Sequence, residues 1–110
     1  MANYTPKKLY TGQPGTTATT LYTAPASTYT LVKNIILCNT TTSDAKVSVS
    51  FVPSGGSAGV TNRIMSDLNV KANDTVAMDL SGFLATGDFI SAVQVTSGAV
   101  TLHVTGVEVT

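Results

Sequence analysis

The sequence is poor in the residues that most often carry chemistry. Its 110 residues include one histidine, one cysteine and no tryptophan, and only 11% are charged, against a usual share of roughly 25%. Six basic and six acidic side chains cancel, which argues against a nucleic-acid-binding protein, because such proteins are normally basic. A neutral chain with few charges is also weakly protected against association. We therefore expect a protein that works within an assembly.

Other absences narrow the class further. The lone Cys38 cannot form an intramolecular disulfide, and the longest clearly apolar run, Ile35 to Cys38, is far too short to span a membrane. The first eight residues lack the apolar stretch of a secretory signal. A chain of this length predicts one domain whose core needs no disulfide or metal. We expect a soluble protein made in a cytoplasm.

What the sequence has in abundance is β-branched residues. Threonine occurs 19 times and valine 13 times, and nine glycines and four prolines supply turns. These residues favour strands. Alternating patterns at the spacing typical of a sandwich predict six strands after residue 29. They cover residues 30–38, 46–51, 63–70, 75–80, 89–95 and 100–109. The predicted fold class is all-β, an antiparallel β-sandwich of jelly-roll-like type.

Turn signals and side-chain alternation predict finer features of these strands. Ser81-Gly82 predicts a turn, and Phe89, Val93 and Val95 are expected to share one face of their strand. In the last strand Val100, Leu102 and Val104 alternate regularly, whereas Val107 and Val109 follow with opposite parity. One extra residue beside Gly106 would explain that change, which predicts a β-bulge there.

The first 29 residues differ from the rest in composition. They hold all four tyrosines and three of the four prolines. Proline favours extended backbone and blocks regular pairing, so residues 1–29 are predicted to form an N-terminal arm with short strand pieces, and residues 30–110 the sandwich domain. Such an arm packs either on its own domain or on a neighbouring chain. Aromatic side chains are typical of interfaces, so the predicted interface residues are Tyr4, Tyr10, Tyr22 and Tyr29.

No catalytic, metal or cofactor site is predicted. His103 stands without a partner pattern, and Ser57 lies in a glycine-rich loop rather than a strand-to-helix elbow. Cys38 ends an apolar strand, so we expect it to be a small buried apolar residue rather than a nucleophile. Oxygen ligands for calcium could come from four residues, but their spacing matches no calcium loop and turn roles fit better. These are Asp67, Asn69, Asn73 and Asp74.

Five short segments carry a resemblance to a known group of proteins: residues 9–17, 21–26, 32–40, 52–59 and 104–108. Their sequences resemble those of small virion proteins of tailed bacteriophages. The resemblance implies a non-enzymatic β-sandwich on the outside of the particle, as a capsid decoration or minor tail component, made in the cytoplasm of the host bacterium. It also implies an oligomer, commonly a trimer, whose partners are its own copies and other capsid or tail proteins. No cofactor, nucleic acid or membrane is implied.

An adhesion module at a phage tail tip or fibre is the alternative. In that case the loops at 39–44, 54–59 and 81–88 would recognise a host receptor or glycan. The lack of tryptophan and the scarcity of aromatic residues in these loops weigh against it.

Overall fold

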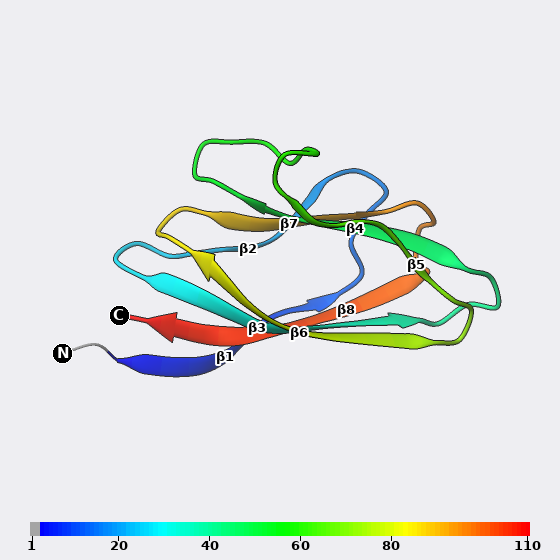
Figure 1. Ribbon diagram of the computed structural model, residues 1–110, viewed down its shortest axis with the longest axis horizontal. Coiled ribbons are helices and arrows are strands. Elements are labelled where there is room, and N and C mark those ends of the chain that lie inside the picture. Colours follow the sequence, from blue (N-terminus) through cyan, green and yellow to red (C-terminus); the bar gives the residue numbers. More distant parts are fainter. Residues whose placement is uncertain (1–2) are drawn as a thin grey trace.

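The computed structural model describes residues 3–110, and over this range the chain forms strands and no helix. The eight strands are β1 (Tyr4–Gly12), β2 (Thr19–Thr23), β3 (Tyr29–Asn39), β4 (Ala45–Val52), β5 (Arg63–Val70), β6 (Thr75–Leu84), β7 (Phe89–Gln94) and β8 (Val100–Val109). They form two antiparallel sheets of four strands packed face to face (Figure 1). The predicted all-β sandwich is therefore confirmed.

The strand order makes the sandwich a jelly roll. Sheet I has the order β1-β8-β3-β6, and sheet II has the order β2-β7-β4-β5. First pairs with last, second with seventh, third with sixth and fourth with fifth, as when one long hairpin is rolled up. This pairing joins residues far apart in sequence and is the arrangement of an eight-stranded jelly roll.

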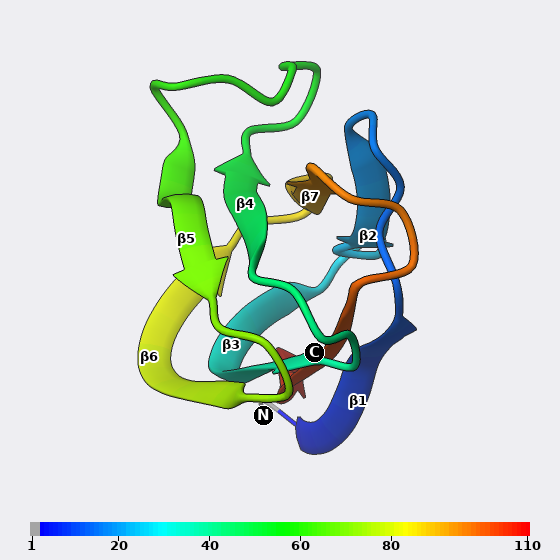
Figure 2. The same cartoon turned by 90° about the vertical axis from the view of Figure 1, so that its right-hand side faces the viewer.

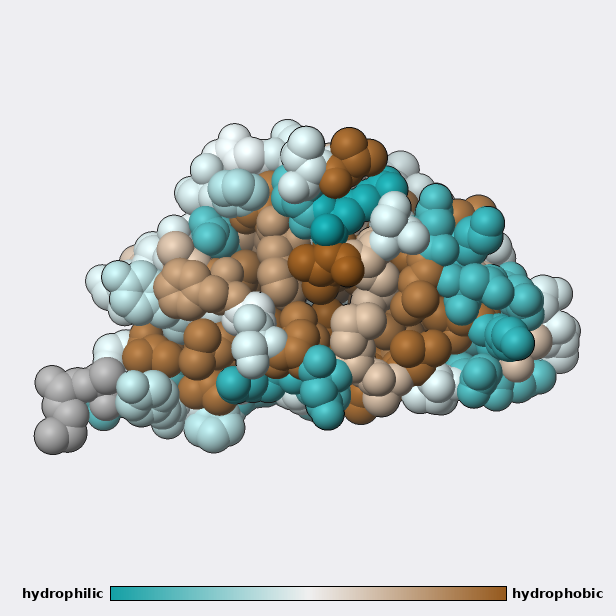
Figure 3. Space-filling model, viewed as in Figure 1, coloured by the Kyte–Doolittle hydropathy of each residue, from teal (hydrophilic) through white to brown (hydrophobic). Residues whose placement is uncertain are grey.

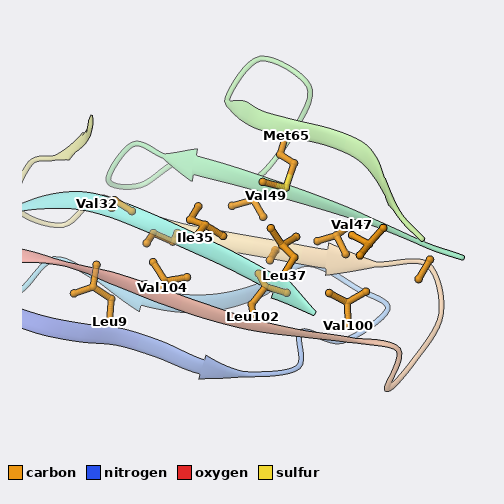
Figure 4. Close-up of a cluster of buried hydrophobic side chains, with 14 of the residues drawn as sticks. Leu9, Val32, Ile35, Leu37, Val47, Val49, Met65, Val100, Leu102 and Val104 are labelled. Carbon is orange, nitrogen blue, oxygen red and sulfur yellow. The ribbon is translucent and has the colours of Figure 1, made fainter. Parts of the chain in front are cut away.

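Alternate side chains from both sheets fill the space between the layers (Figure 4). Val32, Ile35 and Leu37 of β3 face Val47 and Val49 of β4, and all five are fully buried. Because successive strand residues point to opposite faces, an alternating sequence pattern in β4 places valines inside and Lys46 outside. Val100, Leu102 and Val104 of β8 complete the core, as predicted.

The two strands of the predicted arm lie at the edges of the sheets. β1 pairs with β8, and β2 pairs with β7. The turn between them is held by the buried Gln94, whose Nε2 donates to the Pro14 carbonyl (2.6 Å) and whose backbone N–H donates to the Gly15 carbonyl (3.0 Å). The arm therefore packs on its own sandwich. The division into an arm at residues 1–29 and a sandwich domain at residues 30–110 stays a prediction.

The predicted turn at Ser81-Gly82 is wrong, because β6 continues through both residues to Leu84. Gly82 instead allows the Phe51 side chain to pack closely against the backbone of β6. A Cβ at Gly82 would overlap the Phe51 ring, which crosses from sheet II. Glycine in a strand often marks such a close approach. The chain turns only at Ala85–Asp88, where the Asp88 carboxylate accepts the backbone N–H groups of Ala85 and Ser54, at 3.0 Å each.

Phe89 and Val93 share one face of β7, as predicted, and that face is the outer one, because Ile90, Ala92 and Gln94 face the core; Val95 lies beyond the strand. The predicted bulge in β8 is wrong, because β8 has no extra residue. Both neighbouring strands carry one: Leu9 in β1, opposite Val104 and Thr105, and Lys33 in β3, opposite Thr105 and Gly106. The alternation of β8 continues unbroken, and Val107 and Val109 therefore point away from the core.

Each long side of the sandwich joins an edge strand of one sheet to an edge strand of the other (Figure 2). β1 connects to β2 through residues 13–18, and β5 connects to β6 through residues 71–74. On the side of β5 and β6, core side chains remain partly exposed, and apolar surface shows between the two strands (Figure 3). They are Phe51, Leu68, Val76, Met78 and Leu80. Within residues 3–110 no helix is long and apolar enough to cross a membrane.

Candidate assembly surface

The residues that could carry chemistry are not assembled into a reactive site. His103 and Cys38 lie half-buried on the outer face of sheet I, and Ser57 lies in the exposed loop after β4. Between residues 3 and 110, no hydrogen bond joins any two of these three side chains, and no three His, Cys, Asp or Glu side chains are grouped to hold a metal ion. Cys38 was expected to be a buried apolar residue, but it faces outward between Thr75 and Thr101.

The four candidate calcium ligands serve turns and a strand irregularity. Asp67 and Asn73 have positive φ angles of 47° and 55°. The Asp67 N–H donates to Ser48 Oγ at 2.9 Å, and the Asp74 carboxylate accepts the N–H of Thr75 at 2.8 Å. Nearby, the Ala72 N–H donates to Asp44 and lowers the pKa of that carboxyl. Asn73 and Asp74 thus lie at a turn, as expected, whereas Asp67 and Asn69 lie within β5.

One small pocket, of about 80 Å³, lies on the outer face of sheet II, beneath the loop between β4 and β5. Its floor comes from Ser48, Ser50 and Ser91, each about 4% exposed, and Arg63 stands at its rim. The Arg63 guanidinium donates to Ser66 Oγ at 2.9 Å. No aromatic side chain lines the pocket, so it offers no platform for stacking a sugar ring.

The outer face of sheet I carries a different kind of surface at the end where β8 terminates. Two successive rows of side chains, each crossing the sheet from strand to strand, are apolar or aromatic. The first row is Tyr4, Val109 and Tyr29. The second row is Pro6, Val107, Leu31 and Phe83. We call these seven residues the aromatic patch. The ends of β1, β3 and β8 that carry it lie in the lower sheet of Figure 1, towards the marked termini.

The patch is exposed in the isolated chain. Tyr4 is 68% exposed, Phe83 58% and Tyr29 54%. The rings of Tyr29 and Phe83 lie 5.6 Å apart between centroids and are tilted by 37°, within the range of favourable aromatic pairs. None of the seven side chains belongs to the core cluster. Their apolar character therefore has no explanation in the packing of the chain itself.

Hydrogen bonds on the opposite side of the same strands fix the orientation of the patch. Glu108 and Thr30 alternate with the patch residues and point inward, where both contact the Tyr22 hydroxyl of sheet II. That hydroxyl donates to Glu108 Oε2 at 2.5 Å and lies 2.9 Å from Thr30 Oγ1. Lys7 adds an ion pair to Glu108 at 3.4 Å. With their neighbours held inside, Val107 and Tyr29 must point outward.

Burial, together with the bond to Glu108, raises the pKa of Tyr22 from 10.0 to about 12. The phenol is therefore neutral over the physiological range and serves as a donor between the sheets. Tyr22 and Tyr10 both pack against the core. Of the four tyrosines predicted to form an interface, the structure thus brings Tyr4 and Tyr29 into one exposed surface and places the other two inside the molecule.

The remaining patch residues were missed by sequence reasoning. The predicted turn at Ser81-Gly82 puts Phe83 after the end of its strand, and the predicted bulge at Gly106 precedes Val107 and Val109. The sequence did carry one signal for the patch. The apolar residues of the last strand change parity after Val104, so Val107 and Val109 lie on the outer side of β8 and indicate an apolar outer face.

A polar row borders the patch further along the sheet. It consists of Lys8, Thr105, Asn34 and Asp79. Lys8 lies on the edge strand β1 and Asp79 on the opposite edge strand β6, where Asn34 Nδ2 donates to its Oδ1 at 2.8 Å. Lys33, the extra residue of β3, is exposed beside this row. The two edges of the face thus carry opposite charges at the same level.

Comparison with known proteins finds similarity in structure alone. No protein family matches the sequence, and no curated protein is significantly similar to it. A chain in a crystal structure of the T13 particle of infectious bursal disease virus superposes over 98% of this protein with a TM-score of 0.56 and 15% identity. A tobacco streak virus coat protein, seen as a dimer, covers 99% of this chain and 85% of its own length, with a TM-score of 0.47 and 13% identity.

The chain spans about a third of the length of the infectious bursal disease virus chains that it matches. At 15% identity the similarity shows the fold, and it agrees with the jelly-roll strand order.

Proposed function

We propose that this protein is a non-enzymatic structural component of a virus particle, and that it associates with its own copies through the aromatic patch. The observation that carries the proposal is the patch itself: two neighbouring rows of apolar and aromatic side chains, three of them more than half exposed, on a face that the chain does not cover. Large apolar patches with a polar border mark interaction sites.

The kind of partner follows from the chemistry of the patch. Its seven side chains include no carboxylate, amide or cation, and the tyrosine hydroxyls are its only polar side-chain groups. A glycan needs several polar groups to hold its hydroxyls, whereas a protein surface needs apolar and aromatic contacts at its centre with polar groups at the rim. The patch therefore fits a protein partner better than a sugar.

The fold and several short sequence segments support a role in a virus particle. The jelly roll is similar to the fold of a chain from a viral particle, and short segments of the sequence resemble small virion proteins of tailed bacteriophages. We propose that the protein sits on the outside of a tailed-phage particle, as a capsid decoration or minor tail component. The trimer implied by the resemblance stays a prediction.

A structural role also fits the distribution of the polar side chains. Where the structure gives them partners, these are backbone groups in turns or neighbouring side chains within the sandwich. Gln94, Asn39 and Asp88 each fix a loop through several hydrogen bonds. Such bonds stabilise the connections between strands, as a particle component exposed to solvent requires.

Gold-labelled antibody against the protein, viewed on intact virions by electron microscopy, tests the virion assignment. Label over the head would support a decoration protein, and label confined to the tail would support a tail component. Virions without label, while the purified protein binds the same antibody, would contradict the proposal. Binding of fluorescently labelled protein to host cells but not to resistant mutants would support the adhesion alternative instead.

A further inference from the structure

We propose that the aromatic patch joins two copies face to face about a two-fold axis that runs along the strands, with Lys8 of each copy opposite Asp79 of the other. This deepens the proposed function, since it rests on the self-association proposed above and specifies its geometry. The occupant of the patch is a second copy of this chain.

The argument begins with the order of the strands across sheet I, which is β1-β8-β3-β6. A two-fold axis parallel to the strands and between two facing sheets reverses this order in the partner. It therefore places β1 of one copy against β6 of the other, and β8 against β3. Facing sheets with nearly aligned strands are a common packing arrangement, and a two-fold contact uses the same surface on both copies.

Each row of the patch then meets a complementary row. In the second row Pro6 faces Phe83 of the partner subunit, and Val107 faces Leu31 of the partner subunit. In the first row Val109 faces Tyr29 of the partner subunit. Every such contact is apolar or aromatic, and each one occurs twice.

The polar row supplies the second, independent argument. With this axis Lys8 on β1 lies opposite the partner's Asp79 on β6, because both residues belong to the same row. The other charge near this row, Lys33 on β3, lies over the partner's β8 and meets the uncharged Thr105 of the partner subunit. Opposite charges therefore meet at both edges of the contact, while Lys33 of each copy lies beside the axis, next to the polar rows.

A two-fold axis across the strands gives a poorer match. It would place each strand against its own copy and reverse the order of the rows along it. Because β1 would face β1 and β6 would face β6 of the partner, Lys8 and Asp79 would stay on opposite edges wherever this axis lies. The two apolar rows could face each other, but the charges would remain unpaired. With the second row on the axis, Tyr4 would face Lys8 of the partner subunit, which is costly without hydrogen bonds.

The open side between β5 and β6 is a weaker site for the second copy. Its partly exposed residues, such as Met78 and Leu80, already pack against the core, so their apolar character is explained by the fold. The patch residues have no such role. Edge pairing through β1 is also disfavoured, since that strand carries Pro6, Lys7 and Lys8, which protect edge strands from pairing.

A charge exchange tests this geometry in the full chain. Sedimentation equilibrium would compare the wild type with Lys8→Glu, Asp79→Lys, the double variant and an equimolar mixture of the two single variants. Each single change places two like-charge pairs in the dimer, and we expect the dissociation constant to rise about tenfold or more. The double variant and the mixture restore opposite charges, so both should recover the wild-type constant.

Lys46→Glu, on the outer face of sheet II, is the matched control and should leave association unchanged. A two-copy mass with recovery in the mixture supports the pairing. Wild-type association without recovery, an equal effect of Lys46→Glu, or a three-copy mass would overturn this geometry and leave self-association standing. A wild type that stays monomeric at all concentrations would overturn the proposed self-association itself.

Discussion

One region on the outer face of each sheet of this sandwich differs sharply from the other in chemistry. On sheet II the outward positions near the loop after β4 are small hydroxyl residues, Ser48, Ser50 and Ser91, each about 4% exposed. On sheet I the outward positions at the end of β8 are large and apolar, and Tyr4, Tyr29 and Phe83 are more than half exposed. The polar face is covered by the chain's own loop, whereas the apolar face is left open.

Because of this difference, we expect the two surfaces to affect different quantities: the stability of the single chain and the association of its copies. Substitutions on the covered face should change the free energy of unfolding of a single chain. Substitutions on the open face should change how copies associate and leave the single chain nearly as stable as before. Both kinds of change concern outward-facing strand positions, so the contrast cannot be attributed to burial in the common core.

Replacing Phe83 and Val107 by serine should have the largest effect. Burying one such side chain in an interface is worth about 1.5–3 kcal/mol, so the double change should weaken association by at least about a hundredfold. Sedimentation equilibrium measures the constant, and thermal unfolding of the dilute protein should show little change. If association persists unchanged, the patch is not the interface.

Ser50→Leu should have the converse effect on the covered face. The added side chain must enter the closed space beneath the loop after β4, and overpacking of this kind typically costs about 1–3 kcal/mol. Urea unfolding would measure the loss, and the association constant should stay within about twofold of the wild type, an energy of about 0.4 kcal/mol. Unchanged stability would show that the loop moves aside freely.

Tyr22→Phe should destabilise the single chain by about 0.5–1.5 kcal/mol, because Glu108 loses a donor and the two sheets lose a link at the end that carries the patch. Chemical denaturation measures this loss. Should the variant be as stable as the wild type, the contact between Tyr22 and Glu108 contributes nothing to the joining of the sheets.

Alkaline pH offers a second test of the same contact. The folded pKa of Tyr22, about 12, exceeds its ordinary value of 10.0. Its contribution is therefore complete below pH 10 and should be lost as the pH rises towards 12. The wild type should lose more stability over this interval than Tyr22→Phe, in unfolding measured at successive pH values. Parallel pH profiles of the two proteins would contradict the raised pKa.

Val60→Ser should have the smallest effect. Val60 is 81% exposed, more than any aromatic side chain of the patch, but it stands alone in the loop after β4. Neither stability nor association should change by more than about 0.5 kcal/mol. A clear loss of association would show that exposed apolar residues act here without regard to their position, and the contrast between the two faces would fail.

Side-chain alternation was enough to predict the sandwich and most of its strands, because period-two patterns record which face of a strand is buried. The strand predicted at 63–70 pairs with β4 as β5, although Ile64, Met65 and Leu68 are spaced as in a helix. The turn at Ser81-Gly82 was predicted wrongly because a glycine that admits the Phe51 ring looks, in sequence, like a glycine that turns the chain.

The candidate site was predictable only in part. Composition drew attention to tyrosines, and two of the four lie in the patch. The other patch residues could not be predicted, because the register of β8 depends on its neighbouring strands. The apolar residues of β8 change parity near Gly106, but the extra residues that accompany this change lie in β1 and β3. The contact between β8 and β3, which places Val107 beside Leu31, depends on the rolled topology and cannot be inferred from either strand alone.

Hydroxyl-radical footprinting at low and high protein concentration tests the central claim most directly. Oxidation of Tyr4, Tyr29 and Phe83, quantified by mass spectrometry, should fall as the protein associates, while oxidation of Val60 and Val95 should stay constant. Protection of Met78 and Leu68 instead would place the interface on the open side between β5 and β6. Association with no protection of the aromatic patch would contradict the account.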